Sequence, residues 1–154
     1  KHFQTYINRN ADFYRKTKGV PMPVPIEKAL KMIEAGHAKA LELDISVSVA
    51  VVDEGGRLIA FGRMDRARPM SVDIAVNKAY TAATFQQQTT QLAAVSEQSW
   101  FQSLIVSTQG KVIAVGGGIP VLDAPDIIGA AGVSGGTPDQ DQDCARAAVA
   151  AYAD

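Results

Sequence analysis

Cysteine and histidine are scarce in this chain of 154 residues, and neither sign of charge is in clear excess. The single Cys144 excludes a disulfide within the chain and any zinc site built from several cysteines. His2 and His37 are the only histidines, which leaves little for a metal site made of several imidazoles. Fifteen basic residues oppose sixteen acidic ones, for a net charge of −1. A protein that holds nucleic acid by its phosphates normally has a basic excess, so nucleic acid is not an expected partner.

Several patterns that mark common functions are also missing. No apolar run reaches the roughly 18 residues of a membrane-spanning helix, so no membrane partner is expected. The chain has no G-x-x-x-x-G-K-[ST] phosphate loop and no G-x-S-x-G motif. The glycines at 116–118 do not form a G-x-G-x-x-G fingerprint, because Val121 stands where the last glycine would be. Common nucleotide enzymes and serine hydrolases are therefore not expected.

The length suits one domain with one core. Pro21, Pro23 and Pro25 alternate with other residues, which favours an extended linker. We therefore predict an N-terminal appendage and linker over residues 1–24 and a single domain over residues 25–154. The chain begins with Lys1 and not with Met, so we expect a cleaved or omitted leading segment; the compartment, cytoplasmic or exported, stays open.

Two short basic clusters interrupt an otherwise even distribution of charge. One lies in the predicted appendage (Arg15, Lys16 and Lys18) and the other begins at the last residue of a predicted strand (Arg63, Arg66 and Arg68). Neither is long, and the rest of the chain offsets their charge.

Three segments ahead of the last quarter of the chain have helical patterns. Apolar residues recur at three- and four-residue steps over residues 26–44. Ser71 is a suitable N-cap for a second helix over residues 71–85. A shorter helix is predicted around residues 90–95.

The last helix has the clearest start signal in the chain. Thr137 and Gln140 have the spacing of a capping box, and Pro138 occupies the favoured first helical position. Cys144 falls on the apolar stripe of this helix, which indicates a buried structural thiol.

Runs rich in β-branched residues, bounded by turn residues, predict five strands at residues 46–52, 57–63, 103–108, 111–115 and 127–134. The first two strands and the next two are joined by short turns, which favours two antiparallel hairpins. Residues 116–120 are predicted to form a glycine-rich loop. The pattern indicates an α+β fold, with a largely antiparallel five-stranded sheet flanked by helices.

His37 is the first candidate site residue, because it lies on the apolar stripe of the first predicted helix. A histidine on such a face is commonly a hydrogen-bonded core residue. If it faces a cavity instead, its neutral imidazole would be a metal ligand able to bind haem iron.

Lys78 is the second candidate. It shares a helical face with Ile74, Thr81 and Phe85, so its ammonium group should emerge beside apolar neighbours. A buried lysine has a lowered pKa, which suits a catalytic base or an anion contact. The alternative is a lysine that reaches the surface and pairs with Asp73 or Asp53.

Two glycine-rich segments are the third candidate, at residues 116–120 and 132–137. Glycines let backbone N–H groups approach a ligand, and the second segment leads into a helix N-terminus. Together they would hold a carboxylate or another anion, through residues such as Gly117, Gly118, Pro120, Ser134 and Gly135. Tight turns that need positive φ explain the same glycines equally well.

These segments together resemble the GlcG/HbpS family, whose domain is also found at the C-terminal end of PduO-type proteins. The matching stretches run in order along the chain: Val47–Gly56, Arg63–Asp65, Asp73–Ala75 with Lys78–Ala82, Gly117–Pro120 and Ile128–Gly136. The resemblance implies a profilin-like sheet between helices and assembly into homo-oligomers. It also implies a small-molecule ligand, because some members bind haem or are associated with haem degradation.

Three hypotheses of function follow, and the sequence does not decide whether the protein is an enzyme. The first is a small-ligand-binding protein of the GlcG/HbpS type, with haem as the candidate cofactor and with His37 and Lys78 at the pocket. The second is a cofactor-free tautomerase or isomerase of a small keto or hydroxy acid, with Lys78 as the catalytic residue. The third is an accessory subunit whose apolar faces are buried in oligomer contacts.

Overall fold

A computed structural model describes residues 22–154 of the chain. The predicted appendage therefore lies outside the described residues, except for its last three positions. Val24 is buried, and its N–H donates to the Ile128 carbonyl oxygen at 3.3 Å, so the packed domain includes it.

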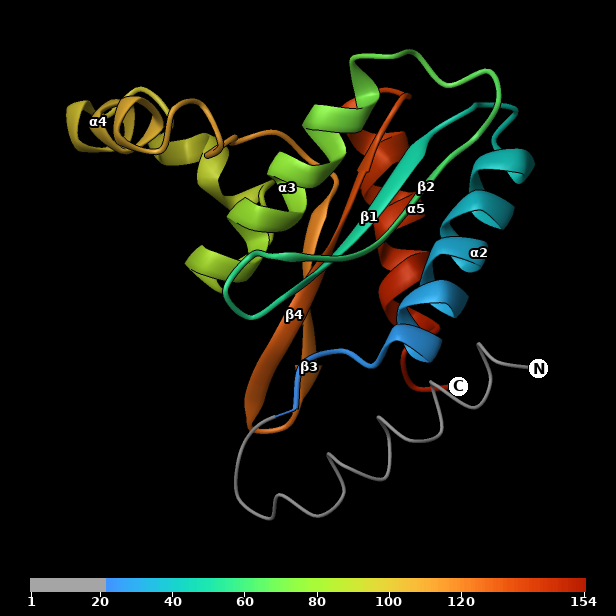
Figure 1. The fold of residues 1–154 in the computed structure, drawn as a ribbon. Helices are drawn as coiled ribbons and strands as arrows, with labels where there is room; N and C mark the ends of the chain where they lie inside the picture. The colour runs from blue at the N-terminus through green and yellow to red at the C-terminus, as the bar shows by residue number, and fades with distance from the viewer. Residues whose placement is uncertain (1–21) are drawn as a thin grey trace.

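In chain order the elements are α2 (Ile26–Glu42), β1 (Ser48–Asp53), β2 (Leu58–Arg63), α3 (Ser71–Phe85), the 3₁₀ helix η1 (Gln91–Val95), α4 (Ser99–Ser107), β3 (Gly118–Asp123), β4 (Asp126–Ser134) and α5 (Pro138–Ala150), as labelled in Figure 1.

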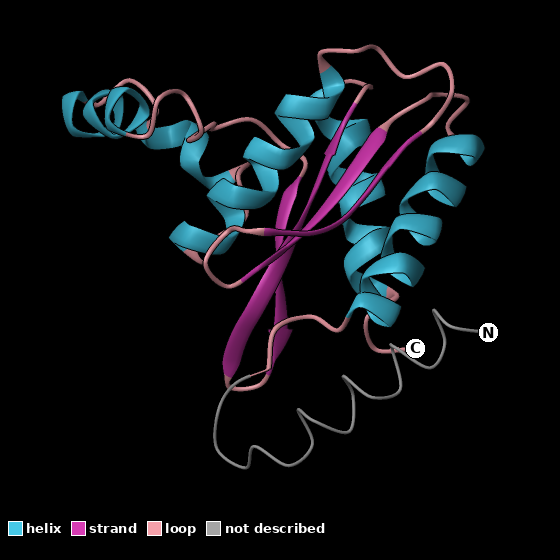
Figure 2. Ribbon diagram, in the orientation of Figure 1, coloured by secondary structure: helices cyan, strands magenta, loops and turns pink. Residues whose placement is uncertain are grey.

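The described strands form one antiparallel sheet in the order β2-β1-β4-β3. The predicted α+β class is confirmed, whereas the prediction of five strands is wrong, because the described residues form four. β1 and β4 occupy the centre of the sheet, and β2 and β3 are its edges. Helices cover both faces, with α2 and α5 on one side and α3 on the other (Figures 1 and 2).

The central strand β1 explains why its sequence is a continuous apolar run. Successive side chains of a strand point to opposite faces. Val49 and Val51 pack into the core beneath α2 and α5, whereas Ala50 and Val52 pack against α3. Both sets are needed because both faces of this strand are buried.

Small residues let α3 lie very close to the sheet. Ala75 and Ala79 face β4, and a Cβ built on Gly132 of that strand would collide with their backbone atoms. This close approach brings the middle of α3, including Lys78, next to the end of β4.

The predicted hairpin over residues 103–115 is wrong. Residues 99–107 form the helix α4, which projects away from the sheet beyond α3 (Figure 1), and residues 111–115 are not a strand. Phe101 of α4 is buried in a small cluster with Leu92 and Val112, so the apolar segment packs as a helix. The predicted Gln109–Gly110 turn does exist, but it ends the helix, with Gly110 N–H donating to the Ile105 carbonyl oxygen at 2.8 Å.

The strand β3 replaces part of the predicted glycine loop, because it begins at Gly118 and contains Pro120. A proline is tolerated in this strand because β3 is an edge of the sheet. A turn at Ala124–Pro125, joined by a cis peptide bond, connects β3 to β4. The predicted strand at residues 127–134 is confirmed as β4, one residue longer.

The two predicted helix starts have different outcomes. The Thr137 side chain accepts from the Gln140 N–H and the Gln140 side chain accepts from the Thr137 N–H, so the capping box is confirmed. Ser71 is not the N-cap of α3; its hydroxyl donates to the Arg68 carbonyl oxygen at 2.6 Å. Over residues 22–154, no helix combines the length and apolar character needed to cross a membrane.

Candidate functional site

Lys78 lies at the centre of a buried polar network between α3, α5 and the end of β4. Its side chain is 2 % exposed. The ammonium Nζ donates to Asp141 Oδ2 at 2.7 Å and to the Val133 carbonyl oxygen at 3.0 Å. The other carboxylate oxygen, Asp141 Oδ1, accepts from the Gly136 N–H at 2.8 Å. The ion pair therefore ties three elements together inside the protein.

The electrostatics of this pair combine two opposing effects. Burial lowers the pKa of the Lys78 ammonium group below its ordinary value, and the Asp141 carboxylate offsets part of that shift. The predicted burial of Lys78 is thus observed, but the partner is Asp141 and neither Asp73 nor Asp53. Asp141 lies 63 residues further along the chain, and the sequence offers no local signal for this pairing.

The first glycine segment meets the same network. The Gly117 N–H donates to Gln142 Oε1 at 2.8 Å, and the Gly118 N–H donates to Thr89 Oγ1 at 2.9 Å. A Cβ on Gly117 would lie 2.6 Å from the Val133 carbonyl oxygen, and the residue has a φ of +118°. Both N–H groups are therefore bound by side chains of this protein, Thr89 and Gln142, which sequence reasoning missed.

The other predicted residues lie around this network. Ser134 is buried at the end of β4, and Gly135 follows it with a φ of +149°. Pro120 is half-buried in β3, opposite Ala130. Thr81, one turn along α3 from Lys78, accepts from the Ile113 N–H at 3.0 Å. Lys78, Gly117 and Gly118 are thus brought together, whereas Thr81 holds the segment that leads into β3.

His37 lies elsewhere, on α2 beside the opposite edge of the sheet. Its ring is half-buried, and Nε2 is 3.1 Å from the Gly62 carbonyl oxygen on β2. A carbonyl oxygen can only accept, so Nε2 carries a proton, and the tautomer that this hydrogen bond selects for a neutral ring has its lone pair on Nδ1. A Cβ on Gly62 would lie 2.8 Å from His37 Cε1, so the glycine allows the ring to rest against the strand.

The metal-binding potential of the described residues is limited to single side chains. No group of three or more His, Cys, Asp or Glu residues within 22–154 is placed to hold a metal ion. Haem differs from a bare ion, because the porphyrin supplies four iron ligands and the protein needs to supply only one or two. His37, with its lone pair on Nδ1, fits that requirement, whereas the sealed Lys78 ammonium does not.

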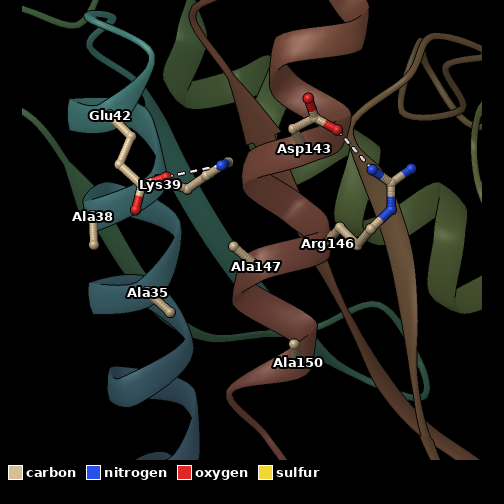
Figure 3. A pocket seen from close by; sticks show the side chains of 8 residues that line it. All are labelled: Ala35, Ala38, Lys39, Glu42, Asp143, Arg146, Ala147 and Ala150. Carbon is tan, nitrogen blue, oxygen red and sulfur yellow. Dashed lines mark hydrogen bonds and ion pairs between the residues drawn. The ribbon is translucent and has the colours of Figure 1, made fainter.

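An open groove lies on the outer surface between α2 and α5, and none of the candidate residues lines it (Figure 3). Its floor is made of alanines. The charged residues at its rim are paired within their own helices, Lys39 with Glu42 at 2.8 Å and Arg146 with Asp143 at 2.6 Å. The groove thus has an apolar floor and two exposed ion pairs at its rim.

Known proteins resemble this chain in both sequence and fold. Residues 24–150 match the model of a family described as haem-degrading protein HbpS-like. An uncharacterized 15.0 kDa protein of Citrobacter freundii, from the dhaT–dhaS intergenic region, is 39 % identical over 132 residues, which are 85 % of this chain and 93 % of that protein. Protein GlcG of Escherichia coli K12 is 38 % identical over 108 residues, or 70 % and 78 % of the two chains.

Solved structures with the same fold include relatives at similar identity. The Klebsiella pneumoniae protein ORFY is 35 % identical, with a TM-score of 0.82 over 90 % of this chain and 95 % of that one. A PduOC–haem complex is 31 % identical, with a TM-score of 0.79 over 84 % and 95 %. A double mutant of Streptomyces reticuli HbpS is 30 % identical, with a TM-score of 0.76 over 88 % and 90 %.

Proposed function

Since the chain belongs to the HbpS-like family, we propose that it is a small-ligand-binding protein whose ligand is haem. The observation that carries the proposal is the similarity over most of both chains to the PduOC–haem complex. The geometry of His37 adds support from this chain itself.

His37 is the proposed iron ligand. The Gly62 carbonyl oxygen fixes both the orientation of the ring and the nitrogen that carries the proton. Such a hydrogen bond to the second ring nitrogen is the usual support of a metal-binding histidine. Haem would supply redox-active iron, and His37 together with the protein surface around it would hold the group.

The roles proposed for Lys78 and the glycine segments remain predictions. A base or anion contact must reach the bound molecule, but both acceptors of Lys78 are internal. The N–H groups of Gly117 and Gly118 also donate to side chains of the protein. This geometry favours a ligand-binding protein over the isomerase hypothesis, and it supports a scaffold role for the network.

A haem titration followed by absorbance tests the proposal. We expect a saturable Soret band for the wild type and its loss or shift in His37→Ala. His37→Gln is the matched variant, because its amide can still donate to the Gly62 carbonyl oxygen but is a poor iron ligand. Met64→Leu is a control for thioether ligation, because methionine sulfur can also bind haem iron. We expect no effect, since the Met64 sulfur already accepts from the Val47 N–H at 3.3 Å. The absence of a saturable band in the wild type would overturn the proposal.

We also propose that the protein forms homo-oligomers through α4. Trp100 and Val106 on this projecting helix are 50 % and 78 % exposed. The segment from residue 86 to residue 110 contains a single charged residue, Glu97. Exposed aromatic residues without charge are typical of interface cores.

Light scattering after size-exclusion chromatography tests this assembly. Trp100→Gln should lower the measured mass. Leu122→Gln is the control, because Leu122 is also exposed, by 59 %, but lies on β3 near the β3–β4 turn and not on α4. A monomeric wild type would contradict the prediction.

A further inference from the structure

The basic cluster of Arg63, Arg66 and Arg68 starts at the last residue of β2 and continues in the loop that crosses to α3 at one end of the sheet (Figure 1). Residues 63–70 contain these three arginines and one acid, Asp65, so the loop has a charge of +2 in a chain whose net charge is −1. Within residues 22–154, no ion pair involves any of the three arginines. Ion pairs among residues 22–154 therefore do not explain the cluster.

The backbone of this loop is firmly held. The Met64 N–H donates to the Val47 carbonyl oxygen at 3.0 Å, and the Ala67 N–H donates to the Met64 carbonyl oxygen at 2.9 Å. Ala67 is 2 % exposed. At the far end of the loop, the Ser71 hydroxyl lies 2.8 Å from the hydroxyl of Ser48 on β1.

The arginine side chains extend from this fixed backbone. Arg63 Nε donates to the Ala67 carbonyl oxygen at 3.0 Å, so the middle of the loop folds back onto the Arg63 side chain. This hydrogen bond does not use the two terminal nitrogens of the Arg63 guanidinium group. Arg66 and Arg68, on either side of Ala67, are exposed. A guanidinium group suits bidentate contact with a carboxylate, and a preformed loop lowers the entropic cost of binding one.

The loop begins next to the proposed iron ligand. His37 Nε2 is 3.1 Å from the carbonyl oxygen of Gly62, and Arg63 is the next residue along β2. Met70, at the end of the loop, is 67 % exposed. The β2 edge and the loop that leaves it thus carry an imidazole, arginines and, at the α3 end of the loop, an exposed apolar side chain. Such a set suits an apolar ring system with carboxylate substituents.

We propose that the loop over residues 63–70 binds the carboxylates of the ligand, with Arg66 and Arg68 as the residues that contact them. For haem these carboxylates are the two propionates. The inference rests on the proposed function, because it assumes that haem binds beside His37.

The test compares haem with haem dimethyl ester, which has the same iron porphyrin but no carboxylate charge. Both probes are titrated into the full chain and into Arg66→Ala/Arg68→Ala. Arg57→Ala/Arg146→Ala is the matched control, because it removes the same charge from two other exposed arginines. Arg63 is left unchanged, since its side chain holds the loop.

The expected result is a haem Kd about tenfold higher in the loop variant than in the wild type. This is the loss of affinity expected when two partly screened ion pairs are removed. The dimethyl ester should bind the loop variant and the wild type equally, and the control variant should bind haem as the wild type does.

Three results would overturn the inference. Equal haem affinity in the loop variant and the wild type would refute the loop as the carboxylate site and leave the proposed function intact. Equal weakening of haem and its dimethyl ester would show that the arginines do not act through carboxylates. No saturable haem binding by the wild type would remove the proposed function and this inference with it.

Discussion

Replacing Lys78 by Met is expected to leave an uncompensated charge inside the protein. The two side chains of the ion pair are 2 % and 4 % exposed. Without the ammonium group, the Asp141 carboxylate keeps the hydrogen bond from the Gly136 N–H and loses its counter-charge. Breaking a buried ion pair in this way costs about 3–5 kcal/mol. Because whole domains are stable by about 5–15 kcal/mol, the free energy of unfolding should fall by a large fraction.

Urea denaturation followed by far-ultraviolet circular dichroism at pH 7 measures this effect. Asp141→Asn removes the other charge but keeps an acceptor for the Gly136 N–H. The double variant Lys78→Met/Asp141→Asn leaves neither charge of the pair buried. Its loss of unfolding free energy should therefore be smaller than the sum of the losses in the two single variants, by about 1–3 kcal/mol. Lys39→Met is the control, because Lys39 pairs with Glu42 on the surface and its loss should leave the midpoint nearly unchanged.

A Lys78→Met midpoint equal to that of Lys39→Met would refute this reasoning, because it would show that the buried carboxylate finds another compensation. Additive losses in the double variant would show that the two charges do not stabilise each other. In either case the network would not be the scaffold inferred above.

Three further predictions concern the fold around the network. Burial raises the pKa of the Cys144 thiol to about 11 from an ordinary 9.0, so the thiol should resist thiol reagents until the protein unfolds. Between these two pH values the unfolded chain loses a proton that the folded chain keeps, so the wild type should lose more stability than Cys144→Ala as the pH rises from 9 to 11. Gly117→Ala should cost about 1–3 kcal/mol of stability and more than Gly110→Ala, because both glycines have positive φ but only Gly117 has a backbone atom in the way of a Cβ. Thr137→Ala should cost about 1 kcal/mol of stability and Thr137→Ser much less, because serine keeps the N-cap acceptor; thermal unfolding measures both.

The elements that the sequence predicts well are those whose local pattern agrees with their final packing. The β1–β2 hairpin, α3 and the capping box of α5 all have this property. The segment 103–108 does not, because a short apolar run suits a strand and a buried helix equally. Phe101 and Ile105, four residues apart, share one face of α4 and pack into the cluster around Leu92, a contact that no local pattern reveals.

The candidate site shows the same limit in its polar contacts. The helical spacing correctly indicates that Lys78 turns inward, and the glycine pattern correctly indicates unusual backbone at Gly117. The partners could not be predicted, because Asp141 and Gln142 lie on α5, 63 residues from Lys78 and 25 residues from Gly117 respectively, and only the tertiary packing brings these groups together. The sequence thus indicates which groups need donors or acceptors, and in the fold the protein itself supplies those found at Lys78, Gly117 and Gly118.

The two groups of candidate residues lie at opposite edges of the sheet, and this separation determines how variants should be interpreted. Lys78 and Gly117 lie where β4 and β3 meet α3 and α5, whereas His37 and Arg63 lie at β2. A Lys78 variant that loses ligand binding together with stability therefore gives no evidence of contact with the ligand. Exposed side chains such as Arg66 and Arg68 can be changed at little cost in stability. A loss of affinity in their variants, at unchanged unfolding midpoint, is therefore evidence of contact at the β2 edge.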